Sequence, residues 1–197
     1  MAEHFPFFAI ISRMKFINRW ALMRNTYSEN LSEHSLDTAI LAHALAVIKN
    51  KRFGGNVNAE QAALLAIFHD ASEILTGDMP TPVKYFNEEI RSSYKQVEES
   101  ACARLLSMLP EDLRPEYEPL ILHREDQELH SIVKAADKLS ALIKCIEERK
   151  AGNMEFANAE KATLEAIKRL NLPELNCFLE ELLPAYMLTL DEQGMSR

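Results

Sequence analysis

The chain of 197 residues contains only 5 glycines, and it has no long, uninterrupted apolar run. No glycine-rich phosphate-binding loop, internal repeat or low-complexity tract is present. No segment is long and apolar enough to span a bilayer, and the N-terminus lacks the pattern of a signal peptide. From these absences we expect a cytoplasmic protein that has no membrane partner.

Cysteine is also scarce, with three residues far apart and outside any CxxC pair: Cys102, Cys145 and Cys177. An odd number at such spacing favours small core residues of a reduced protein over a disulfide framework. The formal net charge of −8 argues against non-specific binding to nucleic acid. We therefore expect no nucleic acid polymer among the partners of the chain.

Long stretches rich in Ala, Leu, Glu and Lys favour helix, and no stretch is typical of a strand. The length fits one domain. We therefore expect a single all-α domain spanning residues 1–197, a helical bundle. The expected helices cover residues 4–16, 32–52, 88–109, 112–122, 128–150, 158–170 and 174–190, and a further one carries His69. Ser32 and Asn58 are the expected N-caps of the second helix and of the helix with His69.

One stretch, residues 62–73, starts as a nearly all-apolar helix and ends with His69, Asp70 and Glu73. A helix that is apolar all round is normally buried, and an imidazole and a carboxylate at its end are costly there unless they are paired or bind a metal. Glu73 follows Asp70 by three positions and His69 by four, so the three side chains can address one region of space. An ordinary polar helix end is the alternative interpretation.

Two further residues, His34 and Asp137, are polar side chains that are expected on other helices, near the apolar core. His34 lies in the first turn of the second expected helix, where a lone histidine is more often at the surface. Asp137 lies inside the helix over 128–150, beside its apolar stripe, where Asp is unfavourable. A salt bridge to Lys134 or Lys138 could explain Asp137, and a metal could explain it better. Together with the His69-Asp70 pair, these residues would suit a divalent first-row metal with positions open for water and substrate.

Two segments cannot be continuous helix. Residues 18–25 are irregular and contain the only Trp, Trp20, beside Arg19; a loop Trp is most often a lid on the core. Residues 76–84 contain a glycine and two prolines. Such a rigid loop can hold the carboxylate of Asp78 and the hydroxyl of Thr81 in fixed positions, or it can be a simple connector.

The sequence resembles the HD-domain phosphohydrolases, whose pattern is a His, a His-Asp pair and a later Asp, and more narrowly the bacterial HD-domain 5′-deoxynucleotidases. The resemblance covers nearly the whole chain, and its longest motif is the most specific. The matching segments are Asn18-Arg19-Trp20, Ser32-Glu33-His34-Ser35, His69-Asp70-Ala71-Ser72-Glu73, Gly77-Asp78-Met79-Pro80-Thr81-Pro82-Val83-Lys84-Tyr85-Phe86 and Ala135-Ala136-Asp137. Met79 stands where Leu is expected, which is a mild change.

The resemblance implies hydrolysis of deoxyribonucleoside 5′-monophosphates by a metal-dependent homodimer, with cobalt favoured and manganese or copper possible. It implies that the metal is held by His34, His69, Asp70 and Asp137. The substrate contacts that it implies are Arg19, Trp20, His34, His69, Asp78, Thr81 and Asp137. Glu73 would then serve as the general acid or base.

Two other classes of function stay open. One is a different HD-domain enzyme, such as a cyclic-nucleotide phosphodiesterase or a triphosphate or alarmone hydrolase, whose pocket should show extra basic residues for the added phosphates. Few basic residues lie near the motifs. The other is a nucleotide sensor without turnover, against which the complete ligand set and Glu73 argue.

Overall fold

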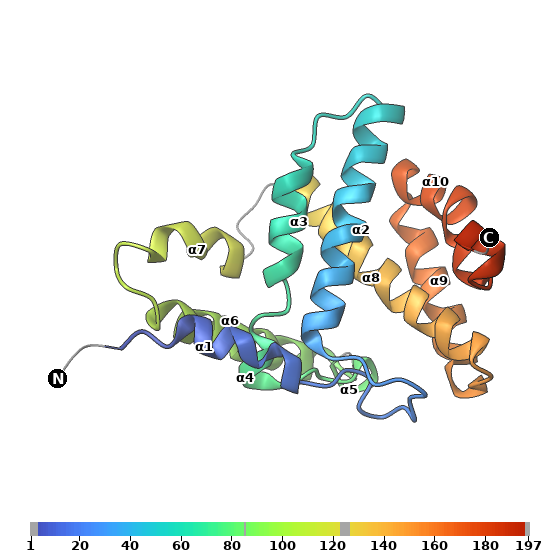
Figure 1. Ribbon diagram of the computed structural model, residues 1–197. Coiled ribbons are helices and arrows are strands. Elements are labelled where there is room, and N and C mark those ends of the chain that lie inside the picture. Colours follow the sequence, from blue (N-terminus) through green and yellow to red (C-terminus); the bar gives the residue numbers. More distant parts are fainter. Residues whose placement is uncertain (1–3, 85, 123–126, 196–197) are drawn as a thin grey trace.

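Helices make up almost all the regular structure of the computed structural model, which describes residues 4–84, 86–122 and 127–195 (Figure 1). The longer helices are α2 (Leu31–Arg52), α3 (Ala59–Phe68), α6 (Glu88–Ser107), α7 (Arg114–Leu122), α8 (Gln127–Lys150), α9 (Ala157–Leu170) and α10 (Pro173–Glu181). The short ones are α1 (Phe7–Ile11), α4 (Glu73–Thr76) and α5 (Thr81–Lys84). Within these ranges no strand occurs, only one isolated antiparallel bridge between Asn18 and Asn30. The all-α prediction is confirmed.

Short 3-10 turns complete the chain at Ser12–Phe16, Met154–Phe156 and Leu183–Met187, and a π-helical turn follows at Asp191–Met195. In the part of the chain that is described, no helix is long and apolar enough to cross a membrane.

The main core lies where α2 packs against α3, α8 and α10, and where α8 packs against α3 and α9. Small and branched apolar residues alternate on the buried face of α2, as in Ala42, Leu45 and Ala46, which are all fully buried. Alanines at such a contact let helix axes approach closely while the leucines fill the space between them. In Figure 1, α2 and α3 stand side by side and α8 crosses behind them.

A second, smaller core is formed by α1, α6 and α7, through residues that include Phe7, Leu105 and Ile121. Phe68, the last residue of α3, packs against both cores, and Ala71 just beyond it is fully buried in the smaller one. The turn that follows α3 is therefore fixed where the two cores meet. This turn carries the His69-Asp70 pair.

The first predicted helix, over residues 4–16, is wrong in extent. The α-helix ends at Ile11 and a 3-10 turn continues to Phe16. Phe7 is buried while Phe8 is 54% exposed, so the helix packs on the core through the face that carries Phe7.

The predicted N-cap of the second helix is also wrong. Asn30, not Ser32, caps α2: its side chain accepts from the backbone N–H groups of Ser32 and Glu33, and the Glu33 carboxylate accepts from the Asn30 N–H. The predicted cap Asn58 is confirmed, since its side-chain oxygen accepts from the N–H of Gln61 at 2.9 Å.

The other predicted helices agree with the structure to within a few residues, except near proline. The prediction over 174–190 is too long, because α10 ends at Glu181 and only a 3-10 turn spans Pro184. The helix predicted from residue 112 begins at Arg114, which leaves Pro115 in the first turn, where a missing N–H breaks no helical bond.

Candidate active site

His34 is presented by the first turn of α2. The reciprocal Asn30–Glu33 capping box fixes where this helix begins, and the neighbouring Leu31 is fully buried. His34 itself has no exposed surface. The expectation that a first-turn histidine lies at the surface is therefore wrong here, because the start of α2 is packed inside the molecule.

His69 and Asp70 follow directly on the last residue of α3. The Nδ1 atom of His69 lies 2.7 Å from the carbonyl oxygen of Ala66, one turn earlier on α3. A carbonyl can only accept, so Nδ1 carries a hydrogen and donates it. In the neutral imidazole, Nε2 then carries the lone pair, which is the form that binds a metal.

Asp137 comes from the middle of α8, next to the buried Ala135 and Ala136. Among the described residues, neither Lys134 nor Lys138 forms an ion pair with it, so the salt-bridge explanation of this residue is not supported. Its Oδ1 instead faces the two histidines, at 3.3 Å from His34 Nε2 and 3.9 Å from His69 Nε2.

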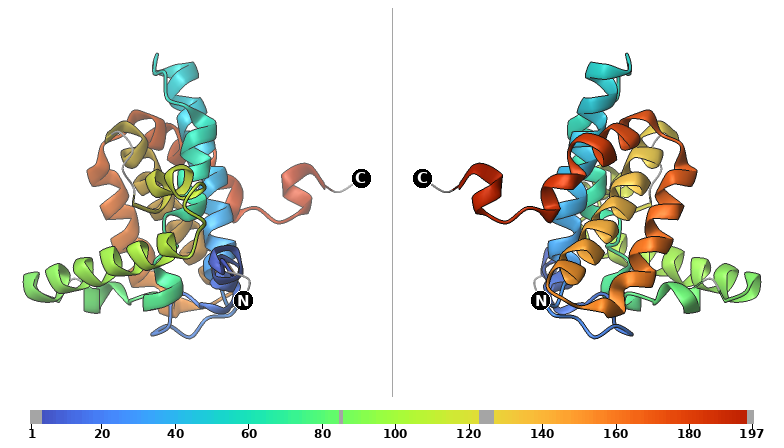
Figure 2. Two further views of the ribbon diagram at one scale, coloured as in Figure 1. Left: turned by 90° about the vertical axis from the view of Figure 1, so that its left-hand side faces the viewer. Right: turned by 90° about the vertical axis from the view of Figure 1, so that its right-hand side faces the viewer.

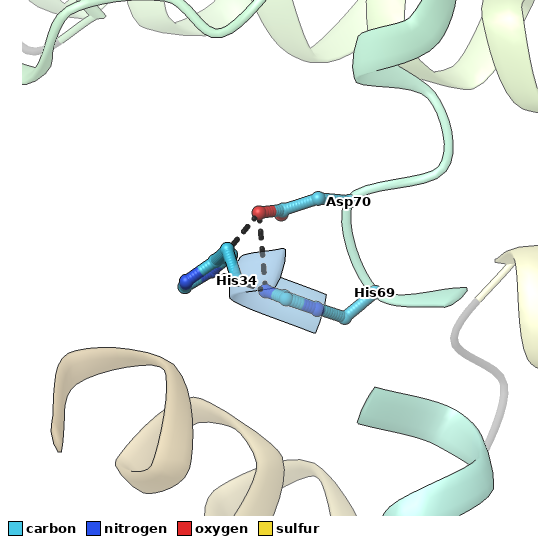
Figure 3. A group of neighbouring side chains, drawn as sticks. All are labelled: His34, His69 and Asp70. Carbon is cyan, nitrogen blue, oxygen red and sulfur yellow. Dashed lines mark hydrogen bonds and ion pairs between the residues drawn. The ribbon is translucent and has the colours of Figure 1, made fainter. Parts of the chain in front are cut away.

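Three of these side chains form a tight group, shown in Figure 3. Asp70 Oδ2 lies 3.1 Å from His69 Nε2 and 3.4 Å from His34 Nε2. The two Nε2 atoms are themselves 3.2 Å apart. With Asp137 facing the same histidines, four donor atoms from α2, α8 and the turn after α3 converge on one region.

This donor set fits a divalent cation. Two imidazole nitrogens and two carboxylates are ligands that first-row divalent metals accept, and the two carboxylate charges balance the charge of such a cation. Ser140, one turn after Asp137 on α8, lies 3.2 Å from the Nδ1 atom of His34. Each imidazole thus has its outer nitrogen engaged and its inner nitrogen directed at the cluster, as metal-binding histidines do.

The electrostatics of the cluster agree with this interpretation. Burial alone would lower the pKa of His69, but Asp70 and Asp137 raise it well above its usual value. Burial alone would raise the pKa of both carboxyl groups, but the two histidines hold the pKa of Asp70 and of Asp137 below its usual range. The cluster therefore keeps its carboxylates ionised and attracts positive charge.

Glu73, unlike Asp70 and Asp137, has a pKa above its usual value. It opens α4, it is buried, and its Oε2 has no hydrogen-bond partner among the described residues. Burial, followed by the nearby charges of Asp70 and Asp78, raises the pKa of Glu73 to about 9. A carboxyl group held in its protonated form at neutral pH beside ionised carboxylates is typical of an acid–base residue.

Arg19 reaches the cluster from the loop that precedes α2. Its Nη1 donates to Asp70 Oδ2 at 3.2 Å, and its Nε donates to Glu29 Oε2 at 3.1 Å. Burial would lower its pKa, but Asp70, Asp137 and Glu29 raise it, so the guanidinium stays charged. A fixed cation at the edge of the cluster can bind an anionic group of a substrate.

Trp20 is partly exposed, and it is held from three sides. Its indole Nε1 donates to Glu29 Oε2 at 2.9 Å, its backbone N–H donates to Asp78 Oδ2 at 3.2 Å, and its ring packs on Phe156 with centroids 5.3 Å apart. The expectation of a lid on the core is thus met only on the Phe156 side.

Asp78 and Thr81 are the two site residues predicted in the loop over residues 76–84, and only Asp78 contacts the site in the described part of the chain. Asp78 is bonded to the backbone of Trp20, and it thereby joins two loops that are far apart in sequence. Thr81 is exposed and begins α5, and in the part of the chain that is described it forms no hydrogen bond with the cluster or with Trp20. Tyr94 of α6 contacts the start of this loop, because its hydroxyl oxygen lies 3.2 Å from that of Thr76.

Ser140 and Glu29 contact the site and were not predicted from the sequence. Ser140 follows Asp137 by three positions on a helix, so its spacing could have indicated a partner for the cluster. Glu29 gave no such signal. It reaches Arg19 and Trp20 only because the chain folds back between Asn18 and Asn30.

Comparison with known proteins places these residues in a known context. Residues 6–186 match the family described as 5′-deoxynucleotidase YfbR-like. The chain is 54% identical over 187 residues to a 5′-deoxynucleotidase of Vibrio cholerae, covering 94% of this chain and 96% of that protein. It is 55% identical over 190 residues to the 5′-deoxynucleotidase YfbR of Escherichia coli, covering 94% of each chain.

Among solved structures, an HD-domain phosphohydrolase from Listeria innocua superposes with a TM-score of 0.80 at 27% identity, covering 96% of this chain and 90% of that one.

Proposed function

The chain belongs to the YfbR-like 5′-deoxynucleotidase family, and on that premise we propose that it hydrolyses deoxyribonucleoside 5′-monophosphates to deoxynucleoside and phosphate with the help of a divalent metal. The observation that carries the proposal is the convergence of His34, His69 and Asp70 beside a charged Arg19. Hydrolysis of a phosphate monoester requires a site that binds the anionic oxygens and a residue that transfers a proton. We assign the proton transfer to Glu73.

The residues that would hold the metal are His34, His69, Asp70 and Asp137. When bound, a divalent cation there supplies Lewis-acid polarisation of the phosphate and a water that ionises near neutral pH. Cobalt is the metal we favour, with manganese or copper as alternatives. The support for this set is that one oxygen of each carboxylate lies within 4 Å of both histidine Nε2 atoms, which are themselves 3.2 Å apart.

Substrate would lie across the open side of the cluster. We assign Arg19 to the phosphate, because a guanidinium binds phosphate oxygens through two N–H groups at once. Trp20 would form a wall for the sugar, with Asp78 and Thr81 on the adjacent loop as further contacts. His34, His69 and Asp137 would face the reacting phosphate from below.

Glu73 would move the proton. Hydrolysis breaks the bond between phosphorus and the 5′ oxygen, and this oxygen must gain a proton as it leaves. A carboxyl group whose pKa is raised to about 9 holds that proton at neutral pH and can donate it. The burial of Glu73 also limits access of bulk water to the group.

We further propose a cytoplasmic homodimer. Three free, buried cysteines suit a reducing compartment. Leu36 and Ile40 lie one turn apart on α2, and each is 59% exposed, so together they offer an apolar surface that a second copy of the chain would cover. The segment after Leu188 projects away from the body of the molecule in Figure 2 and carries the exposed Leu190. Light scattering after gel filtration tests the dimer, and a monomeric mass would contradict it.

The activity is tested with the wild-type chain supplied in turn with Co²⁺, Mn²⁺ and Cu²⁺. Deoxynucleoside and nucleoside mono-, di- and triphosphates and a cyclic nucleotide are each offered, and phosphate release is measured. We expect release from deoxynucleoside monophosphates above all others. Turnover only of triphosphates or cyclic nucleotides would identify a different HD-domain enzyme, and binding without release would identify a sensor.

A further inference from the structure

The loop that carries Arg19 and Trp20 is closed by a short antiparallel pairing of its two ends. The Arg19 N–H donates to the Glu29 carbonyl at 2.9 Å, and the Leu31 N–H donates to the Ile17 carbonyl at 2.9 Å. This pairing places the side chain of Glu29 beneath the two residues to which we assign the phosphate and the sugar. Glu29 is buried, so it is inaccessible to a substrate.

A single oxygen of Glu29 serves both residues. Oε2 accepts from Arg19 Nε at 3.1 Å and from Trp20 Nε1 at 2.9 Å. The bond to Nε fixes the plane of the guanidinium, and with it the direction in which Nη1 points at Asp70, 3.2 Å away. The bond to the indole fixes the rotation of the Trp20 ring about its side-chain torsions.

Trp20 needs such a restraint, because its backbone is in the left-handed region with φ of 60°. A bulky residue without glycine's freedom is strained there, and such a conformation persists only where its surroundings impose it. The bonds to Asp78 and Glu29 and the contact with Phe156 impose it. Of these three, only the bond to Glu29 is shared with Arg19.

We propose that Glu29 is a positioning residue that sets the phosphate-binding guanidinium and the sugar-facing indole in one common geometry. The proposal rests on the function proposed above. It differs from a purely structural role for Glu29, in which the carboxylate would stabilise the loop and leave the affinity for substrate unchanged in the folded protein.

The experiment compares Glu29→Ala and Glu29→Gln with Glu60→Gln as the matched control. Glu60 is an exposed carboxylate in the first turn of α3, and among the described residues no hydrogen bond or ion pair links it to Arg19, Trp20 or the histidine–aspartate cluster. For each variant, circular dichroism and metal content establish folding and cation binding. The kinetic readout is kcat and KM for dAMP.

A second readout is independent of turnover. Trp20 is the only tryptophan of the chain, so intrinsic fluorescence and its quenching by acrylamide report on this side chain alone. We expect Glu29→Ala to shift the emission to longer wavelength, to increase quenching, and to raise KM by about 10- to 100-fold, the usual effect of losing a charged hydrogen bond. Glu29→Gln should restore the emission, because its amide oxygen still accepts from the indole, while KM stays raised because the charge facing Arg19 is gone.

The control should match the wild type in both readouts. A folded, metal-binding Glu29→Ala variant with unchanged KM and unchanged fluorescence would overturn the proposal, as would a loss confined to kcat. If Glu29→Ala does not fold, the KM of Glu29→Gln decides by itself. A wild type that releases no phosphate would refute the proposed function, whereas the fluorescence comparison would still decide whether Glu29 holds Trp20.

Discussion

The Nε2 atoms of His34 and His69 lie 3.2 Å apart, although His34 belongs to α2 and His69 to the turn after α3. His69 donates through Nδ1 to Ala66, so its Nε2 lone pair points toward the partner ring. Two imidazole nitrogens can lie this close only when a proton or a cation lies between them. The geometry of this pair is therefore that of a binding site for positive charge, completed by Asp70 and Asp137.

Replacement of a ligand should remove the metal. We expect His69→Ala and Asp137→Ala to lose both bound cation and activity, because each removes one of four converging donors. Ser140→Ala should keep the site but weaken cation binding by about 10- to 100-fold, the usual cost of losing a partner behind a metal-binding histidine. Metal analysis of the purified variants measures both effects.

His43→Ala is the matched control for these variants, since His43 is an exposed histidine on α2. It should retain metal and activity. Full cation content in both His69→Ala and Asp137→Ala would show that the metal site is assigned wrongly.

Loss of Glu73 should separate chemistry from binding. We expect Glu73→Ala and Glu73→Gln to keep metal and substrate affinity while kcat falls by about 10²–10⁴-fold, the range for a general acid or base. Glu73→Gln preserves the buried shape, so a fall in that variant cannot be blamed on packing. Near-normal kcat in both variants would reduce Glu73 to a neighbour of the site and direct attention to Asp78.

Sugar selectivity should depend on Trp20 and not on Arg19. An added ribose hydroxyl pressed against an indole face finds no acceptor, and such discrimination is usually worth about 10²-fold. We expect Trp20→Ala to narrow the ratio of kcat/KM for dAMP over AMP, and Arg19→Ala to weaken both substrates alike. Tyr27→Ala, which removes an aromatic ring 73% exposed in the same loop, is the control. An unchanged ratio in Trp20→Ala would place the discrimination elsewhere.

Glu148, which contacts the loop that carries Arg19 and Trp20, should make the stability of the folded state depend on pH in the acid range. This buried carboxylate pairs with Lys144 and accepts from the backbone N–H groups of Thr26 and Tyr27. Burial would raise its pKa, but the hydrogen bonds from Lys144, Thr26 and others lower it to about 2. The usual value of 4.5 applies to the unfolded chain, so the unfolded state binds more protons between these two values. The stabilisation is therefore complete above pH 4.5 and is lost as the pH falls from 4.5 toward 2.

Denaturant midpoints measured across this range should fall more steeply for the wild type than for Glu148→Gln. Near neutral pH the variant should be the less stable of the two, because Lys144 then lacks its buried counter-charge. Glu165→Gln, on an exposed position of α9, should follow the wild type. Parallel curves for the wild type and Glu148→Gln would refute this assignment.

Most of the fold could be predicted from the sequence, because its signals are local. The apolar stripe of α8, the cap at Asn58 and the prolines of the 76–84 loop each determine structure within a few residues. The start of α2 was misplaced because Asn and Ser are almost equally good caps, and nothing local decides between Asn30 and Ser32. Tertiary packing decides it.

The site was predictable only in part, for the same reason. The His69-Asp70 pair and Asp137 are conspicuous as polar groups in apolar surroundings, and the structure brings them together with His34. The left-handed backbone of Trp20 could not be predicted, because no glycine marks it and its bonds come from residues up to 58 positions away.

The separate origins of the four donor atoms also bear on thermal stability. α2, α8 and the turn after α3 meet at the cluster, so a cation bound there links three parts of the chain and is lost when they separate. Binding to the native state alone stabilises it by about 2.7 kcal/mol when the free cation is at 100 times its dissociation constant. A chelator should consequently lower the melting temperature as well as the rate, and the heat tolerance of this protein in a cell should vary with the supply of its metal.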